Sequence, residues 1–152
     1  LVHAISQQGN GDITLQFLDD GSAVTGGGYR YAVYGKDSNG TDRILTGNNT
    51  TSFQLFDDQK SGDNTPVSGY MYFHNGNGGN WDSDSSDSEG NVRPSVQWQW
   101  GGKDSNNYHR VAQGSGHYDD TAANTLNGFK LNFAGGSGAT KVNLTIYGIK
   151  RS

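Results

Sequence analysis

The sequence predicts an all-β protein, a jelly-roll-like antiparallel β-sandwich with long loops rich in Gly, Asn and Asp. Apolar and polar residues alternate in many short runs, and a period of two is typical of strands that bury one face. Gly, Asn, Asp and Ser fill the gaps between those runs, as turns and loops require. We therefore expect a single domain over residues 1–152, with roughly eight to ten short strands.

The first half of the chain contains five runs that read as strands. They cover residues 1–5, 13–17, 29–34, 43–45 and 51–56. The first of them is short and apolar, so we expect it at the edge of a sheet. Turn residues at 19–22 and the pair Asn39-Gly40 mark reversals after the second and third runs.

A strand predicted over residues 67–74 carries four large side chains in strict alternation. Tyr70 and Tyr72 point one way, and Met71 and Phe73 point the other. The polar stretch that follows, residues 75–91, is too long for a tight hairpin and is interpreted as a surface excursion.

Trp98 and Trp100 share one face of the next predicted strand, over residues 96–100. Exposed aromatic faces serve as stacking platforms in sugar-binding sandwiches. We interpret this pair as core instead, because the chain has few aliphatic residues and aromatic rings dominate burial where they are available. A weaker strand is predicted over 108–111, and a loop over 114–127.

The chain closes on a predicted hairpin. Apolar residues alternate with polar ones over 129–133 and again over 142–147, and a run of glycine and serine lies between them at 134–138. Because glycine adopts the positive φ angles that a reversal needs, we expect these two strands to pair with each other.

Composition excludes several classes of function. The net charge is −4 and basic clusters are missing, so binding to nucleic-acid phosphates is not expected. No apolar run in the sequence approaches the ~20 residues that span a bilayer. The chain has no cysteine, which rules out disulfides and thiolate chemistry and fits synthesis in a reducing cytosol.

Several of these segments occur in an order that resembles a domain of tailed-bacteriophage virion proteins. The most specific match is the last segment, Leu-Thr-Ile-Tyr-Gly-Ile-Lys at 144–150, which follows a glycine-rich gap and the segment Gly-Phe-Lys-Leu at 128–131. A Val-Ser-Gly-Tyr strand at 67–70, a Tyr-x-Tyr strand at 29–31 and an early strand at 13–17 precede it. The polar stretch at 75–91 departs from that pattern.

The resemblance implies a small jelly roll on a tail fibre, a tail tip or a capsid surface, often as a trimer. It implies a non-enzymatic structural or adhesive protein that decorates the capsid or forms part of the tail and contacts other virion proteins. Its location would be the virion, assembled in the host cytoplasm. A thin core also favours a homo-oligomer, since association would bury further apolar surface. A trimer is the form we expect.

An acidic loop is the one candidate for a metal site, and we expect no cofactor. Its carboxylates are Asp82, Asp84, Asp87 and Glu89. Hard cations take oxygen ligands from such loops, but the spacing does not fit an EF-hand. A solvated acidic loop is therefore the preferred interpretation.

The alternative function is carbohydrate binding, as a module or a receptor-binding tip that recognises bacterial surface glycan. Trp81 lies in the polar stretch among side chains that hydrogen-bond to sugar hydroxyl groups, and it is the candidate stacking ring. Its candidate partners are Asn77, Asn80, Asp82 and Asn91. A contact within an assembly is an equally good reading of Trp81.

Catalysis is the least favoured reading. His117 precedes Asp119 and Asp120, which would suggest acid–base chemistry. Neighbouring residues on a strand point to opposite faces, however, so closeness in sequence does not bring these groups together. Neither a Gly-x-Ser-x-Gly elbow nor a His-Glu-x-x-His motif is found in the sequence.

Overall fold

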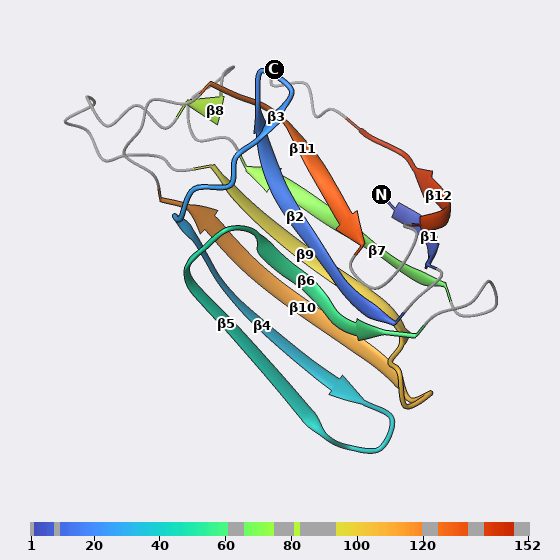
Figure 1. Cartoon of the computed structure of the whole chain (residues 1–152). Coiled ribbons are helices and arrows are strands. Elements are labelled where there is room, and N and C mark those ends of the chain that lie inside the picture. The colour runs from blue at the N-terminus through green and yellow to red at the C-terminus, as the bar shows by residue number, and fades with distance from the viewer. Residues whose placement is uncertain are drawn as a thin grey trace.

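Figure 1 shows two β-sheets packed face to face in the computed structural model, which describes residues 2–7, 10–60, 66–74, 81–82, 94–119, 125–133 and 139–147. All strand pairs are antiparallel. The predicted all-β sandwich is therefore confirmed, while jelly-roll connectivity stays a prediction. No helix able to span a membrane occurs among the described residues.

The larger sheet has seven strands. Their order is β12 (Ala139–Leu144), β1 (Val2–Gln7), β7 (Val67–His74), β9 (Ser95–Lys103), β10 (His109–Tyr118), β4 (Tyr29–Asp37) and β5 (Asp42–Thr50). The smaller sheet has the order β3 (Ser22–Ala23), β2 (Gly11–Asp19), β11 (Thr125–Phe133) and β8 (Trp81–Asp82), and β6 (Phe53–Gln59) also pairs with β2.

The core lies between the two sheets and is dominated by aromatic rings. From the smaller sheet Phe17 and Phe53 are fully buried, and from the larger sheet Tyr29 and Trp100 are fully buried. The rings of Tyr29 and Phe53 meet edge to face with their centroids 4.9 Å apart, a favoured arrangement of aromatic pairs. Trp98, 2% exposed, joins this cluster, so the interpretation of both tryptophans as core is confirmed.

Tyr29 also ties the two sheets together through its hydroxyl group. The backbone N–H of Phe17 donates to Tyr29 Oη at 2.9 Å, and that hydroxyl donates to the carbonyl of Val24 at 3.0 Å. Burial raises the pKa of Tyr29 to about 12 against its ordinary 10.0. The hydrogen bond from Phe17 opposes this rise only in part.

The loop predicted over 114–127 is wrong at both ends, because β10 continues to Tyr118 and β11 begins at Thr125. Gly114 and Gly116 suggested a loop, but both lie on the inward side of the strand. A Cβ on Gly114 would come within 2.6 Å of the Trp98 ring, and one on Gly116 within 2.6 Å of the Phe53 ring. These glycines are strand residues that make room for large rings.

The predicted C-terminal hairpin is also wrong. The strands at its two ends form as expected, but β11 pairs with β2 in the smaller sheet and β12 pairs with β1 in the larger sheet. Alternation fixes which face of a strand is buried, and it does not say which neighbour the strand has. For the same reason the first strand was misplaced: β1 lies between β12 and β7 and not at an edge.

The two predicted turns are confirmed, and the two strands after the second turn are longer than expected. Asp20 and Gly21 have φ angles of 44° and 79° between β2 and β3, and Gly40 has 84° between β4 and β5. The runs at 43–45 and 51–56 extend to nine residues in β5 and seven in β6. Polar residues account for most of the added length. They belong to the strands because backbone hydrogen bonding between strands does not require an apolar side chain.

Candidate functional site

The outer face of the larger sheet, which points away from the smaller sheet, aligns side chains in rows across five strands. One row runs Ile44, Tyr34, Gln113, Gln99 and Tyr70 from β5 to β7. The adjacent row runs Thr46, Ala32, Ser115, Gln97 and Tyr72. Residues opposite one another in antiparallel strands lie side by side, so each row is a continuous strip of side chains.

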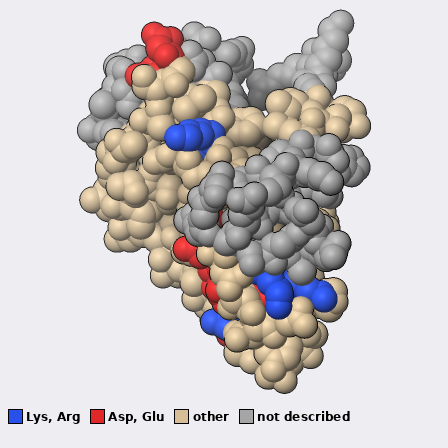
Figure 2. Space-filling view, turned by 45° about the vertical axis from the view of Figure 1, so that its right-hand side comes forward, with Lys and Arg blue, Asp and Glu red and all other residues tan. Residues whose placement is uncertain are grey.

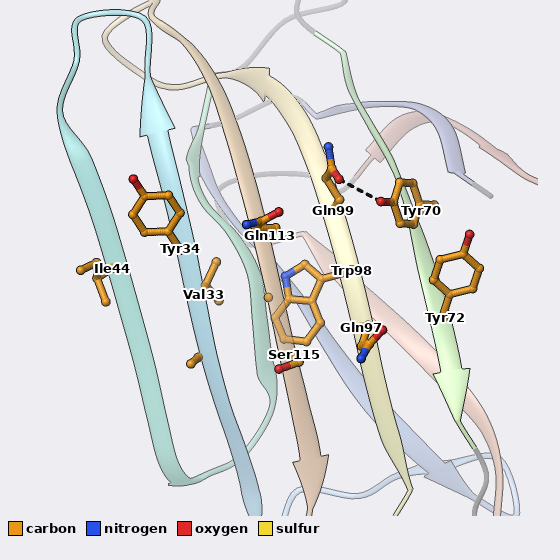
Figure 3. Close-up of a pocket in the computed structure, with 12 residues that line it drawn as sticks. Val33, Tyr34, Ile44, Tyr70, Tyr72, Gln97, Trp98, Gln99, Gln113 and Ser115 are labelled. Carbon is orange, nitrogen blue, oxygen red and sulfur yellow. Dashed lines mark hydrogen bonds between the residues drawn. The ribbon is translucent and has the colours of Figure 1, made fainter.

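These rows line an open depression of about 510 Å³, here called the tyrosine groove. The side chains that define it are Tyr34, Ile44, Tyr70, Tyr72, Gln97, Gln99, Gln113 and Ser115. Figure 3 shows Tyr34 and Ile44 at one side, Tyr70 and Tyr72 at the other, and the glutamines between them. Ala32 and Ser115 are small, which deepens the surface between the rings.

The rings of the groove are accessible to a ligand. Tyr34 is 47% exposed, Tyr72 55% and Ile44 71%. Tyr70, 37% exposed, lies beside Tyr72 with the ring centroids 5.3 Å apart and the planes tilted by 57°. Large apolar groups gathered in one exposed patch are unusual for a sheet face in contact with water only, and they indicate an interaction site.

The floor of the groove is made of amides with unused hydrogen-bonding capacity. Tyr70 donates its hydroxyl proton to Gln99 Oε1 at 2.8 Å, which fixes the ring and leaves the NH₂ group of Gln99 as a donor. The amides of Gln97 and Gln113 make no hydrogen bond with any described residue. Each offers two donors and a carbonyl acceptor.

Charged groups flank the rows and do not enter them. At one end Lys36 Nζ lies 3.3 Å from Asp42 Oδ1, which also accepts a hydrogen bond from Tyr34 at 3.1 Å. At the other end Arg30 Nε lies 2.9 Å from Asp119 Oδ2. On the face visible in Figure 2, acidic and basic side chains are mixed at the lower end and form no large patch of one sign.

The side chains that define the groove are aromatic, aliphatic, amide and hydroxyl groups. None of the side chains that define it is a carboxylate or an imidazole, the groups that most often transfer protons in catalysis. What it offers instead is aromatic faces at both sides and neutral donors and acceptors in between. Ligand sites of this kind combine apolar contact with a few placed polar groups.

A second cluster of polar residues is buried at one end of the sandwich. Arg110, 2% exposed, forms an ion pair with Asp57, donates to the Asp57 carbonyl at 3.1 Å and lies 5.0 Å above the Phe56 ring. Burial, with a smaller effect from Arg43, lowers its pKa to about 10, so it stays charged at neutral pH. Its Nε has no hydrogen-bond partner among the described residues. The ion pair with Asp57 and the contact with Phe56 hold the side chain in place, and we assign this cluster a structural role.

Two loops at that end are held by aspartates. Asp37 Oδ1 accepts hydrogen bonds from the backbone of Asn39 and Thr41, each at 2.9 Å. Asp104 Oδ1 accepts one from the backbone of Tyr108 at 2.9 Å. Within the described part of the chain, no three His, Asp or Glu side chains gather as a metal ion would require.

Most residues predicted from the sequence to form a site lie outside the described residues. Those are Asn77, Asn80, Asn91, Asp84, Asp87 and Glu89, so the glycan and metal predictions for that stretch stay predictions. Trp81 and Asp82 form β8, paired with Leu126 and Thr125 at the edge of the smaller sheet. The structure thus places the backbone of Trp81 in a sheet.

Of the residues considered for acid–base chemistry, the structure describes His117 and Asp119. His117 lies opposite Arg30 and Ser95 in the larger sheet, and Asp119 is bound to Arg30. Asp120 lies outside the described residues. The ion pair with Arg30 gives Asp119 a structural partner.

Sequence reasoning missed the groove although its signals were present. The alternation that placed Trp98 in the core also places Gln97 and Gln99 on the opposite face, beside Tyr70 and Tyr72. Finding the groove required the register between five strands, and no single strand carries that information.

A scan against protein-family models, a search of curated proteins and a search of solved structures each returned no match.

Proposed function

We propose that this protein is a non-enzymatic adhesion domain of a tailed-bacteriophage particle, and that the tyrosine groove binds an uncharged glycan of the host surface. The proposal that the groove binds a glycan rests on one observation: tyrosines and glutamines are aligned in two rows across β5, β4, β10, β9 and β7. The particle context rests on the resemblance of the closing strands to virion proteins.

The chemistry of the groove matches that of a sugar ring. A pyranose has one face of C–H groups, which packs on the negatively polarised face of an aromatic ring. Its edge carries hydroxyl groups that both donate and accept hydrogen bonds, as the amides of Gln97 and Gln113 do. Tyr72 provides the more exposed ring and Tyr70 the more fixed one.

The absence of charge within the rows favours a neutral ligand over an anionic one. Lys36 and Arg30 are the nearest cations at the two ends, and each is already paired with an aspartate. Binding of a neutral sugar would be insensitive to ionic strength, because screening acts on interactions between charges.

A glycan array with neutral and anionic bacterial oligosaccharides tests the proposal. We expect neutral glycans to bind the intact protein and the Tyr72→Ala variant to lose most of that signal. The matched control is Tyr108→Ala, because Tyr108 is 40% exposed and does not line the groove. Loss of binding in both variants, or binding of anionic glycans alone, would contradict the proposal.

The particle context has its own test. Mass spectrometry and immunogold labelling of purified phage particles would detect the protein on the virion, and its absence there ends that part of the proposal. The expected trimer is tested by light scattering coupled to size exclusion. A trimer that Tyr72→Ala dissociates would show that a second copy of the chain, and not a glycan, occupies the groove.

A further inference from the structure

We infer that the ligand is a linear oligosaccharide that lies across the strands and contacts both aromatic sides of the groove at once. This inference rests on the proposed function and adds the length and the direction of the ligand. It follows from the spacing of the rings, which is set by the sheet itself.

The two aromatic sides are too far apart for one sugar ring. Tyr34 is on β4 and Tyr70 is on β7, with β10 and β9 between them. Three strand-to-strand steps of about 4.8 Å place these positions roughly 14 Å apart. A ligand in contact with both sides must therefore be several sugar rings long.

The direction of the ligand follows from the same register. Tyr34, Gln113, Gln99 and Tyr70 stand opposite one another in a single row. A chain of sugars along this row would stack on a ring at each side and meet an amide at each step between. Along β4, by contrast, charged groups limit the uncharged surface, since Lys36 and Arg30 lie beyond the two rows.

The two sides are not equivalent. Tyr70 is fixed by its hydrogen bond to Gln99 and has Tyr72 beside it, so this side is the stronger platform. Tyr34 stands with Ile44, which is 71% exposed. We expect short ligands to occupy the Tyr70–Tyr72 side first and longer ligands to reach Tyr34 in addition.

Titration calorimetry with malto-, cello- and chito-oligosaccharides, each from mono- to hexasaccharide, tests this inference. We expect affinity in at least one series to rise with chain length and then level off, and a second aromatic contact to contribute roughly a two- to tenfold gain. Tyr34→Ala should remove the gain for long members and leave short members unchanged. Tyr72→Ala should weaken both, and Tyr108→Ala neither.

The outcomes separate the inference from the proposed function. Affinity that is independent of chain length, with Tyr34→Ala silent at every length, overturns the inference and leaves glycan binding standing. Binding that survives both Tyr34→Ala and Tyr72→Ala places the glycan elsewhere on the protein and overturns both. Absence of binding to every member of the three series also counts against both.

Discussion

The two faces of the larger sheet use the same strands and the same kinds of residue for opposite purposes. On the inner face Trp98 and Trp100 of β9 are at most 2% exposed. On the outer face Tyr70 and Tyr72 of the neighbouring strand β7 are 37% and 55% exposed. The role of an aromatic ring is thus decided by its odd or even position along the strand, which determines whether it packs or remains available to a partner.

The two faces of the larger sheet also differ in how they accommodate large side chains. The inner face sets large rings against glycines, as Trp98 against Gly114, because a packed core has no spare volume. The outer face sets rings at the sides and amides between them. We expect inner-face changes to cost stability and outer-face changes to cost binding.

The largest effect on stability is expected from Trp100→Ala on the inner face. Trp100 is fully buried, and loss of such a side chain costs about 3–5 kcal/mol through lost burial and the cavity that remains. Urea unfolding monitored by circular dichroism gives the free energy of unfolding. Its outer-face counterpart, Tyr72→Ala, should change this value by less than about 0.5 kcal/mol. Equal losses in the free energy of unfolding for Trp100→Ala and Tyr72→Ala would contradict the distinction between the two faces.

A smaller loss is expected from Gly116→Ala. The added Cβ would lie 2.6 Å from the Phe53 ring and 2.8 Å from the Arg30 carbonyl, and overpacking of this kind costs about 1–3 kcal/mol. Gly101→Ala is the control, because a Cβ there meets its nearest atom at 3.9 Å. Chemical denaturation of both variants checks this, and a neutral Gly116→Ala would show that the inner face is loosely packed.

Tyr29→Phe is expected to cost about 1–3 kcal/mol, because it removes the hydroxyl group that accepts a buried hydrogen bond from the Phe17 N–H. The contribution of Tyr29 to stability should also fall as the pH rises from 10 to 12. The folded protein keeps the Tyr29 proton up to about pH 12 whereas the unfolded chain releases it near pH 10.0, so the folded state binds more protons in that window.

The pH dependence of the Tyr29→Phe variant separates this group from others. Arg110, whose pKa is lowered to about 10, acts with the opposite sign, because its unfolded form binds more protons above that pH. It is present in both proteins and cancels in the difference. A stability difference that does not shrink between pH 10 and 12 would show that Tyr29 is not the group responsible.

The smallest effect is expected from Tyr70→Phe, which keeps the ring and removes the hydrogen bond to Gln99 Oε1. Stability should change by less than about 0.5 kcal/mol, since the side chain is exposed. Glycan affinity should fall by a smaller factor than in Tyr70→Ala, because the ring is retained. Calorimetric titration of the two variants compares these losses, and equal losses would assign the whole effect to the hydroxyl group.

Local patterns of residues predicted most of the longer strands, the buried face that carries Trp98 and Trp100, and the turns at Gly21 and Gly40. They did not predict strand partners, because pairing depends on contacts between residues distant in sequence. Thus β11 and β12, adjacent in the chain, were expected to pair and belong to different sheets. Gly114 and Gly116 were read as loop residues, since only the fold places Trp98 and Phe53 against them.

The candidate site was harder to predict for the same reason. Sequence reasoning concentrated on Trp81, where aromatic and polar residues are adjacent along the chain. The groove assembles Tyr34, Gln113, Gln99 and Tyr70 from four strands, and each is an ordinary exposed or half-buried residue in its own strand. They form a continuous surface only because the register of the strands places them side by side.

Nuclear magnetic resonance tests the central claim most directly, by observing the side-chain amides of Gln97, Gln99 and Gln113 during titration with the tightest-binding oligosaccharide of the three series. These NH₂ signals form the floor of the tyrosine groove, and their assignment follows from Gln→Asn variants. We expect all three to shift in proportion to the bound fraction while signals from the Arg110 cluster stay in place. Saturable binding that leaves the three glutamine amides unchanged would contradict the assignment of the groove.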